Sequence, residues 1–181
     1  NINLPGLGNV TYDLAFGGAF YAYVKAVDLN LKGTPSEHYL LIEKGVSIKR
    51  AITAGRPVVH PFEKDLSFLY GTIFTAPSAS QDVFSRNVCI FADGEVDRSP
   101  TGTGVSGYLA ILYRRGQIKV NEPIIIESII SSRFTGCIVE ATSFGPHPAI
   151  IPEIEGSAYI TGRHEFLIDP MDPLRNGFIL R

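Results

Sequence analysis

The sequence predicts an α+β domain in which a mostly antiparallel sheet wraps around one buried central helix. Two observations carry this prediction. Residues 103–115 are apolar on nearly every side of a helix, and short runs rich in β-branched and aromatic residues precede and follow them. A helix that is apolar on most sides and flanked by strands is best covered by a sheet that curls around it.

The first strand-like stretch covers residues 10–31 and is rich in Tyr, Phe, Val and Ala. Gly17 and Gly18 interrupt it, which predicts a strand that is broken or bulged where its backbone comes close to another group. Further strands are expected at 68–75 and 87–92, separated by a loop at 77–80. The region from 118 to 168 is also strand-like, with turns expected at Gly136, 145–148, Gly156 and Gly162.

A first helix is expected to begin after Thr34, because Thr34 and Glu37 have the spacing of a capping box around Pro35. Gly55 is well placed to end this helix, as Gly116 is to end the enclosed one. The residues expected to face a sheet are Leu41, Gly45, Ile48 and Ile52. No internal repeat or low-complexity linker is present, so residues 1–181 are expected to form one domain.

The composition argues against two classes of partner. The 16 Lys and Arg nearly balance the 18 Asp and Glu, so the net charge of −2 provides neither the basic field that nucleic acid needs nor an acidic tail. The longest apolar run, near residues 123–130, is interrupted by Glu127 and is far shorter than a membrane span of about 20 residues. We therefore expect no nucleic-acid and no membrane partner.

The cysteines and histidines predict no metal site. Cys89 and Cys137 lie in strand-like segments, are expected to point into the core, and have neither zinc-site spacing nor the density of a disulfide framework. A cytoplasmic location is therefore expected. His38, His60, His147 and His164 are scattered without metal-ligand spacing, which favours structural or solvent-facing roles. Because the chain begins with Asn1, we expect a piece of a longer or processed protein.

The most informative stretch, FADGEVDRSPTGTG, runs from Phe91 to Gly104 and leads from a strand end into the enclosed helix. Its glycines let a ligand approach the backbone, and the first amides of a helix lack internal partners, so Gly102 and Thr103 can bind an anion. Asp97 would repel a phosphate dianion. It suits a ligand with both a carboxylate and an ammonium, the amides binding the first and Asp97 the second.

A purely structural interpretation is open as well: Ser99 or Thr101 caps a core helix and Asp97 is a turn residue. A family resemblance favours the interpretation in which Asp97, Gly102 and Thr103 bind a ligand. The string DRSPTGTG resembles the motif DRSPCGTG of the proline racemase family, with one departure at Thr101. The string FGGAF at 16–20 is similar to a YGGNF strand of that family. Further strings typical of its hydroxyproline dehydratase branch lie at 69–73 (LYGTI), 162–166 (GRHEF), 172–174 (DPL) and 177–178 (GF).

The resemblance implies the fold of diaminopimelate epimerase, in which two like domains each wrap a helix and the active site lies between them. On that basis residues 1–181 form the C-terminal, substrate-binding domain; Asp97, Gly102 and Thr103 bind substrate, and Phe91 lines its ring. The family's first catalytic cysteine lies in an MCGHG-type motif of the N-terminal domain, and nothing in this sequence matches it. The N-terminal domain is therefore an expected partner, and this chain alone is expected to be inactive.

Thr101 stands where the family has the second of two opposed acid/base cysteines. A thiol, with an ordinary pKa of about 8.5, becomes a thiolate at a helix N-terminus, whereas an aliphatic hydroxyl lies beyond such tuning. Racemisation needs an acid/base group on each face, so Thr101 disfavours it. The resemblance then implies a cofactor-independent lyase that dehydrates trans-3-hydroxy-L-proline to Δ1-pyrroline-2-carboxylate, with Thr101 orienting the leaving hydroxyl or donating a proton to it.

Two alternatives stay open. One is a proline racemase or 4-hydroxyproline epimerase, against which Thr101 argues. The other is a non-catalytic amino-acid-binding module, with which intact Asp97, Gly102 and Thr103 agree. The expected ligand is hydroxyproline or proline, without cofactor or metal. Because members of the resembled family are often homodimers, a homodimer is a further expectation.

The substitution Thr101→Cys tests the chemical part of this interpretation. In the complete protein it should raise epimerisation at Cα, because it restores a second thiol on the opposite face of the substrate. Chiral chromatography of the products measures the effect. Unchanged product stereochemistry would count against the interpretation.

Overall fold

A computed structural model describes residues 1–179, so the last two residues of the expected domain, 180 and 181, lie outside the described part. Within the described residues no helix is both long and apolar enough to cross a membrane. The helices are η1 (Ala26–Leu29), η2 (Pro35–Glu37), α1 (His38–Gly55), η3 (Lys64–Leu66) and α2 (Gly102–Arg114). The strands are β1 (Ile2–Leu4), β2 (Gly8–Val10), β3 (Asp13–Phe16), β4 (Phe20–Lys25), β5 (Leu69–Ala76), β6 (Ser85–Phe91), β7 (Glu95–Val96), β8 (Ile124–Glu127), β9 (Arg133–Phe144) and β10 (His147–Gly156).

One curled sheet organises the fold. Its strand order is β10-β9-β8-β6-β5-β4-β3, with β7 paired to β6, while β1 and β2 form a separate pair. The β4–β5 and β6–β8 pairs are parallel and the other pairs are antiparallel. The prediction of an α+β domain with a mostly antiparallel sheet is therefore confirmed.

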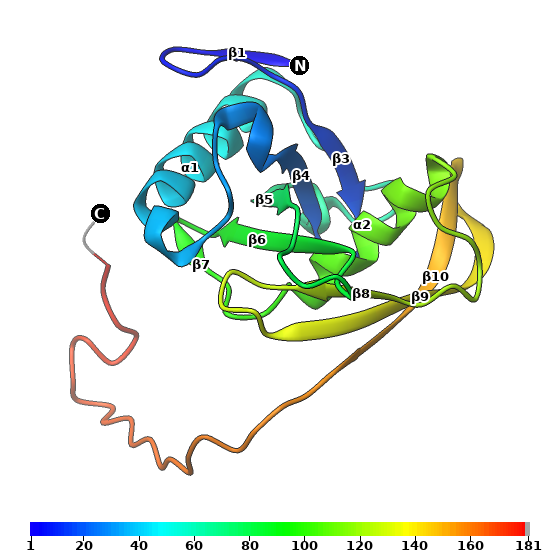
Figure 1. Ribbon diagram of the computed structural model, residues 1–181. Helices are drawn as coiled ribbons and strands as arrows, with labels where there is room; N and C mark the ends of the chain where they lie inside the picture. The colour runs from blue at the N-terminus through cyan, green and yellow to red at the C-terminus, as the bar shows by residue number, and fades with distance from the viewer. Residues whose placement is uncertain (180–181) are drawn as a thin grey trace.

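The two α-helices lie on opposite faces of this sheet. Helix α1 packs on β5 and β6, whereas α2 lies inside the curl and contacts β3, β4, β9 and β10 (Figure 1). Alternation along β4 reflects this arrangement: Tyr21 and Tyr23 join a cluster with Ile111 of α2, and the intervening Ala22 joins the cluster under α1. The apolar helix predicted at 103–115 is thus the enclosed central helix.

Helix α1 agrees with its sequence signals. The backbone N–H of Thr34 donates to Glu37 Oε2 at 3.2 Å, which is the expected capping box. One turn of 3₁₀ helix, η2, precedes the α-helix, which ends at Gly55. The buried residues of α1 are Leu41, Gly45, Ile48 and Ile52, the set predicted to face the sheet.

The glycine pair at 17–18 marks a chain reversal. Strands β3 and β4 pair antiparallel around it, with Phe16 opposite Phe20, so the stretch predicted as one interrupted strand is a hairpin. A methyl group on Gly17 would collide with the carbonyl oxygen of Thr103, and one on Gly18 would lie 2.9 Å from Thr103 Cγ2. The predicted close approach of backbone is therefore confirmed, and its partner is the first turn of α2.

The prediction was wrong in part of the C-terminal third. Gly136 lies within β9 and makes no turn; a methyl group there would stand 3.1 Å from Val105 and Leu109 of α2, so the glycine lets helix and strand approach each other. Strand structure ends at Gly156, although it was expected to continue to residue 168.

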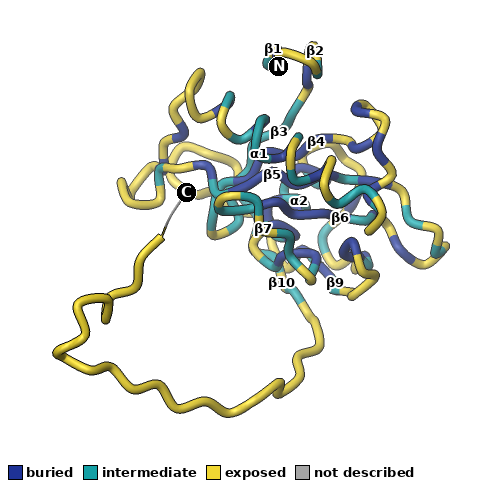
Figure 2. Tube along the Cα trace, turned by 90° about the vertical axis from the view of Figure 1, so that its left-hand side faces the viewer, coloured by how far each residue is buried: buried dark blue, intermediate teal, exposed yellow. Residues whose placement is uncertain are grey.

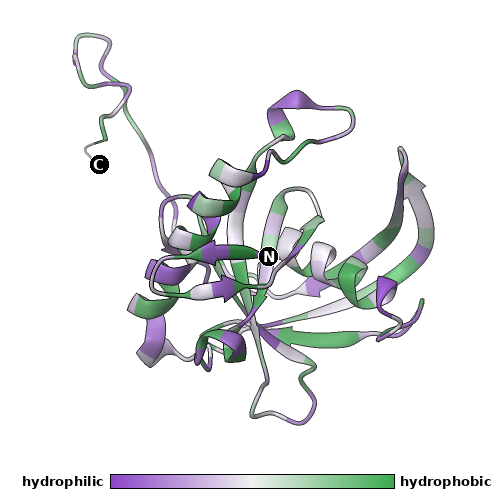
Figure 3. Cartoon of the chain, turned by 90° about the horizontal axis from the view of Figure 1, so that it is seen from above, coloured by the Kyte–Doolittle hydropathy of each residue, from purple (hydrophilic) through white to green (hydrophobic). Residues whose placement is uncertain are grey.

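Residues 157–179, which we call the tail, leave the body of the domain as an extended and exposed segment (Figures 1 and 2). Apolar and polar residues are interspersed along it (Figure 3). The composition of the tail is typical of a strand, but a strand needs a neighbouring strand to pair with its backbone groups. The described part of the chain offers the tail no such neighbour, so the tail stays extended and unpaired.

Two glycines of α1 provide a matched test of this packing. Gly45→Ala should lower the free energy of unfolding by about 1–3 kcal/mol, because the new methyl would lie 2.8 Å from Cβ of Ile90 in the closely packed face. Gly55→Ala should be neutral or stabilising by up to about 1 kcal/mol, since nothing lies within 4 Å of that position and alanine favours helix. Urea unfolding measures both. Equal effects of the two substitutions would contradict the packing described here.

Candidate functional site

A cavity of about 390 Å³ opens at the N-terminus of α2. Strands β4, β5 and β6 and the segment that leads into α2 supply its walls. The lining residues are Tyr21, Tyr70, Phe91, Asp97, Thr101, Gly102 and Thr103. All five residues singled out from the sequence therefore lie together in one cavity, and Tyr21 and Tyr70 are additional members that sequence reasoning did not name.

The floor of the cavity is the exposed start of a helix. Thr101 adopts a positive φ of 68°, which turns the chain so that Gly102 begins α2. The helix hydrogen bonds start with the amide of Val105, which donates to Thr101 O at 2.7 Å. Within residues 1–179 no protein acceptor is recorded for the amides of Gly102 and Thr103, and the space beside Gly102 is open. These two amides are therefore available to an anion, with the helix dipole adding to the attraction.

Asp97 provides the negative group of the same cavity. Its Oδ1 accepts hydrogen bonds from Ser99 N at 2.8 Å and Ser99 Oγ at 3.0 Å. Its Oδ2 accepts one from Thr101 Oγ1 at 2.7 Å. The carboxylate is thus held in a fixed orientation by its own loop, and the hydroxyl protons of Ser99 and Thr101 are both committed to it.

These bonds decide part of the structural alternative. Thr101 occupies the N-cap position of α2, but its side chain makes no capping hydrogen bond to the helix. The hydroxyl of Ser99 accepts the amide of Thr101 at 3.0 Å, so Ser99 stabilises the turn that precedes the helix. The structural alternative, in which Ser99 or Thr101 merely caps α2, therefore does not hold for Thr101, whose hydroxyl is directed at Asp97.

Aromatic side chains form the apolar wall. The ring of Tyr70 stacks on Phe91 at a centroid distance of 5.6 Å and meets Tyr21 edge-on at 5.7 Å. The hydroxyl of Tyr21 lies 2.9 Å from Thr103 Oγ1, and burial raises the pKa of Tyr21 above its ordinary range, so this phenol stays neutral. The wall thus combines an apolar surface with one hydroxyl pair.

The sequence carried a signal for both tyrosines. Tyr70 lies inside one of the family-like strings, and Tyr21 follows another directly. Tyr21 and Tyr23 are also two residues apart, which puts them on the same face of a strand. What the sequence did not reveal was that this face meets α2, 82 residues away.

The cysteines do not supply a nucleophile to the cavity. Cys89 is fully buried on β6 beneath Thr101, and burial raises the pKa of its thiol to about 12, with the charge of Asp97 acting in the same direction. Its predicted place in the core is confirmed, whereas Cys137 on β9 is only partly buried.

His60 has a structural role, as expected. Its Nδ1 accepts the amides of Phe62 and Glu63 at 3.3 and 2.8 Å, which orders the loop that contains it. In the described part of the chain no group of three or more His, Cys, Asp or Glu side chains is placed to hold a metal ion.

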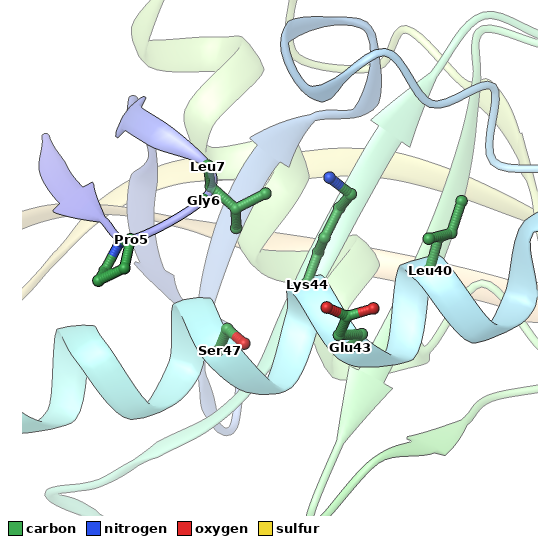
Figure 4. A pocket seen from close by; sticks show the side chains of 7 residues that line it. All are labelled: Pro5, Gly6, Leu7, Leu40, Glu43, Lys44 and Ser47. Atoms are coloured by element: carbon green, nitrogen blue, oxygen red, sulfur yellow. The ribbon is translucent and has the colours of Figure 1, made fainter.

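A second hollow of about 170 Å³ lies between the β1–β2 loop and α1, on the side of the sheet that faces away from α2 (Figure 4). It is lined by Pro5, Gly6, Leu7, Leu40, Glu43, Lys44 and Ser47. None of the residues predicted to bind a ligand lies there. The candidate site is therefore the larger cavity at the start of α2.

Comparison with known proteins gives concordant matches. The family model described as proline racemase matches residues 1–179. A trans-3-hydroxy-L-proline dehydratase of Colwellia psychrerythraea is 49% identical over 180 residues, which are 99% of this chain and 51% of the relative. A proline racemase of Clostridioides difficile is 40% identical over 181 residues, covering 99% of this chain and 54% of that protein.

The structural comparison agrees. The crystal structure of a hydroxyproline epimerase from Agrobacterium vitis, with bound trans-4-hydroxy-L-proline, matches with a TM-score of 0.91 at 36% identity, over 99% of this chain and 51% of that one. The chain thus spans about half the length of these three relatives, each of which carries the name of an enzyme.

Proposed function

Because this chain belongs to the proline racemase family, we propose that it forms the carboxylate- and ammonium-binding half of an enzyme that dehydrates trans-3-hydroxy-L-proline to Δ1-pyrroline-2-carboxylate. The observation that carries the proposal is the residue at position 101. Thr101 stands where the racemase motif has its second cysteine, and its hydroxyl donates a hydrogen bond to Asp97. The name of the Colwellia psychrerythraea relative supports the same reaction.

The cavity has the charges that an imino acid needs. The free amides of Gly102 and Thr103 suit the carboxylate, and the helix dipole contributes about 0.3–1 kcal/mol, or up to about 2 kcal/mol when partly buried. Asp97 suits the ring ammonium, since a hydrogen bond between charged groups is worth about 1.5–3 kcal/mol. Phe91 and Tyr70 offer the apolar ring of the substrate a flat surface.

The proposed reaction needs one base and no cofactor. A base takes the α-proton, and the charge that spreads onto the carboxylate is stabilised by the amides of Gly102 and Thr103. The electron pair then forms the Cα–Cβ double bond while the C–O bond breaks, and the departing hydroxide takes the proton that the base removed, which yields water and restores the base. The enamine product tautomerises to Δ1-pyrroline-2-carboxylate.

Stereochemistry suggests what Thr101 contributes. In trans-3-hydroxy-L-proline the carboxylate and the hydroxyl lie on opposite faces of the ring, so the α-hydrogen and the hydroxyl share a face. A base opposed to Thr101 removes the proton from that shared face, and the leaving hydroxyl then points away from Thr101 too. We therefore assign Thr101 the task of holding Asp97 in place, since its single hydroxyl proton is already donated to that carboxylate.

We propose that the base comes from an N-terminal domain of the same protein, and that residues 1–181 are the C-terminal domain of the pair. The half-length coverage of the relatives supports this division. So does the tail, whose side chains Phe166 and Leu167 are 85% and 88% exposed. A solved relative of about twice the length matches 99% of this chain, and we infer that the exposed apolar side chains of the tail pack against the additional part of the complete protein.

Two further expectations remain part of the proposal. The expectation of a homodimer rests on the resemblance to the proline racemase family alone. A cytoplasmic location fits the two free thiols, Cys89 and Cys137, because a reducing compartment keeps thiols unpaired.

The competing functions differ in their chemistry. The name of the Clostridioides difficile relative favours a racemase, but a racemase needs a second acid/base group where this chain has Thr101. A non-catalytic binding module would use the same amides and the same Asp97. Turnover is therefore the property that separates the three.

The complete protein should convert trans-3-hydroxy-L-proline to Δ1-pyrroline-2-carboxylate and leave L-proline and trans-4-hydroxy-L-proline unchanged. The imine product is measured by its reaction with o-aminobenzaldehyde, and epimers by chiral chromatography. The 181-residue chain alone should be inactive. Epimerised products would favour a racemase or epimerase, and binding without turnover would favour the binding module. Turnover by the isolated chain would overturn the proposal that the base comes from an N-terminal domain.

Replacing Thr101 tests its assigned task. Thr101→Val should weaken the binding of L-proline to the complete protein by roughly tenfold, because the Asp97 carboxylate loses the hydrogen bond that holds it in place. A hydrogen bond to a charged group is worth about 1.5–3 kcal/mol. Thr101→Ser keeps the hydroxyl and is the matched control. Calorimetry measures the affinity. If Thr101→Val abolishes dehydration while L-proline binds as tightly as before, Thr101 is the proton donor to the leaving group instead.

A further inference from the structure

Two tyrosines of β4 reach the first turn of α2 in different ways. The hydroxyl of Tyr23 is buried and donates to the carbonyl oxygen of Gly104 at 2.7 Å. The hydroxyl of Tyr21 lies 2.9 Å from Thr103 Oγ1, and both of these residues line the cavity. The first contact supports the helix, whereas the second sits where a ligand binds.

We propose that Tyr21 is a positioning residue that orients the side-chain hydroxyl of Thr103, so that the pair donates one hydrogen bond to the carboxylate of the substrate. This inference rests on the proposed function and adds a third donor to the two backbone amides. The residue that orients this donor comes from β4, a strand far in sequence from the motif that supplies the amides.

Counting protons supports the proposal. The pair holds two hydroxyl protons, and the bond between the hydroxyls uses one of them, whichever is the donor. Within residues 1–179 no other hydrogen bond is recorded for either hydroxyl. One proton is therefore left for a ligand. Burial raises the pKa of Tyr21, which keeps the phenol protonated and the count valid at neutral pH.

The position of Thr103 indicates which group of the ligand receives that proton. Its backbone amide is one of the two that face the carboxylate site, so its hydroxyl belongs to the donor side of the cavity. The hydroxyls on the Asp97 side are already committed, because Ser99 and Thr101 donate to the carboxylate. The Tyr21–Thr103 pair thus keeps a hydroxyl proton for an anion, while Asp97 attracts the cation.

The pair is held in place before a ligand arrives. Gly18, at a positive φ of 111°, lies so close to Thr103 that a methyl group there would stand 2.9 Å from Thr103 Cγ2. The ring of Tyr70 meets that of Tyr21 edge-on at 5.7 Å. A donor whose orientation is fixed in advance helps most when charge grows on its acceptor, which happens as the α-proton leaves. Tyr21 should therefore affect kcat as well as affinity.

The test uses the complete protein and compares Tyr21→Phe with Tyr23→Phe, a matched loss of one phenolic hydroxyl from the same strand. Tyr21→Phe should weaken the binding of L-proline about threefold to tenfold and lower kcat for trans-3-hydroxy-L-proline more than it changes KM. Pyrrolidine, which lacks a carboxylate, should bind both forms alike. Tyr23→Phe should lower the melting temperature while changing the affinity for L-proline less than Tyr21→Phe does.

A double-mutant cycle separates positioning from general support of the fold. If Tyr21 acts through Thr103, then Tyr21→Phe combined with Thr103→Val should bind L-proline no more weakly than Thr103→Val alone. Thr103→Ser should retain most of the affinity, and it keeps the test available should Tyr21→Phe fail to fold. Independent, multiplying losses in the double variant, or wild-type affinity in Tyr21→Phe, would overturn the inference.

The binding readout does not depend on the reaction. If the complete protein binds L-proline but turns over no hydroxyproline, the dehydratase proposal fails while the Tyr21 inference is still decided by the affinities. If dehydration is observed and Tyr21→Phe behaves as wild type in binding and kcat, the inference fails alone.

Discussion

The close contact between the β3–β4 hairpin and the first turn of α2 determines the rest of the site. It is possible because Gly17 and Gly18 carry no side chains, so backbone meets backbone at Thr103. The hydroxyl of Tyr23 donates a hydrogen bond to Gly104 O, which fixes the distance between the first turn of α2 and the sheet. A shift of this turn would move both free amides and the Thr103 hydroxyl, so the geometry of the anion-binding groups is set by the sheet as much as by the helix.

This contact produces a cavity whose two ends have opposite electrostatic character. The helix start offers amide protons and a partial positive charge, and Asp97 offers a carboxylate that is held by Ser99 and Thr101. A simple anion would gain at one end and be repelled at the other. A zwitterion gains at both, which is the physical reason for proposing an imino acid, and not a phosphate, as the ligand.

The sequence predicted those parts of the structure whose causes are local. The periodicity of α1, its capping box and the apolar faces of α2 depend on residues a few positions apart, and the motif around Asp97 folds back on itself within one loop. The contact between Tyr21 and Thr103 spans 82 positions, so no local pattern contains it. The turn predicted at Gly136 was wrong for a similar reason. This glycine lets β9 approach α2, and no local pattern shows that the helix lies across the strand.

A threonine at position 101, where the resembled motif has a cysteine, would have a consequence beyond the absence of one base. In a two-base site the carbanion is reprotonated quickly from the opposite face, and that return competes with every other fate of the intermediate. With a hydroxyl that is already committed to Asp97, no such proton is offered. An intermediate that carries a leaving group next to its charged carbon then has time to expel it. Under the proposed function, the threonine at position 101 would therefore change the class of reaction from inversion to elimination, while the groups proposed to bind the substrate stay in place.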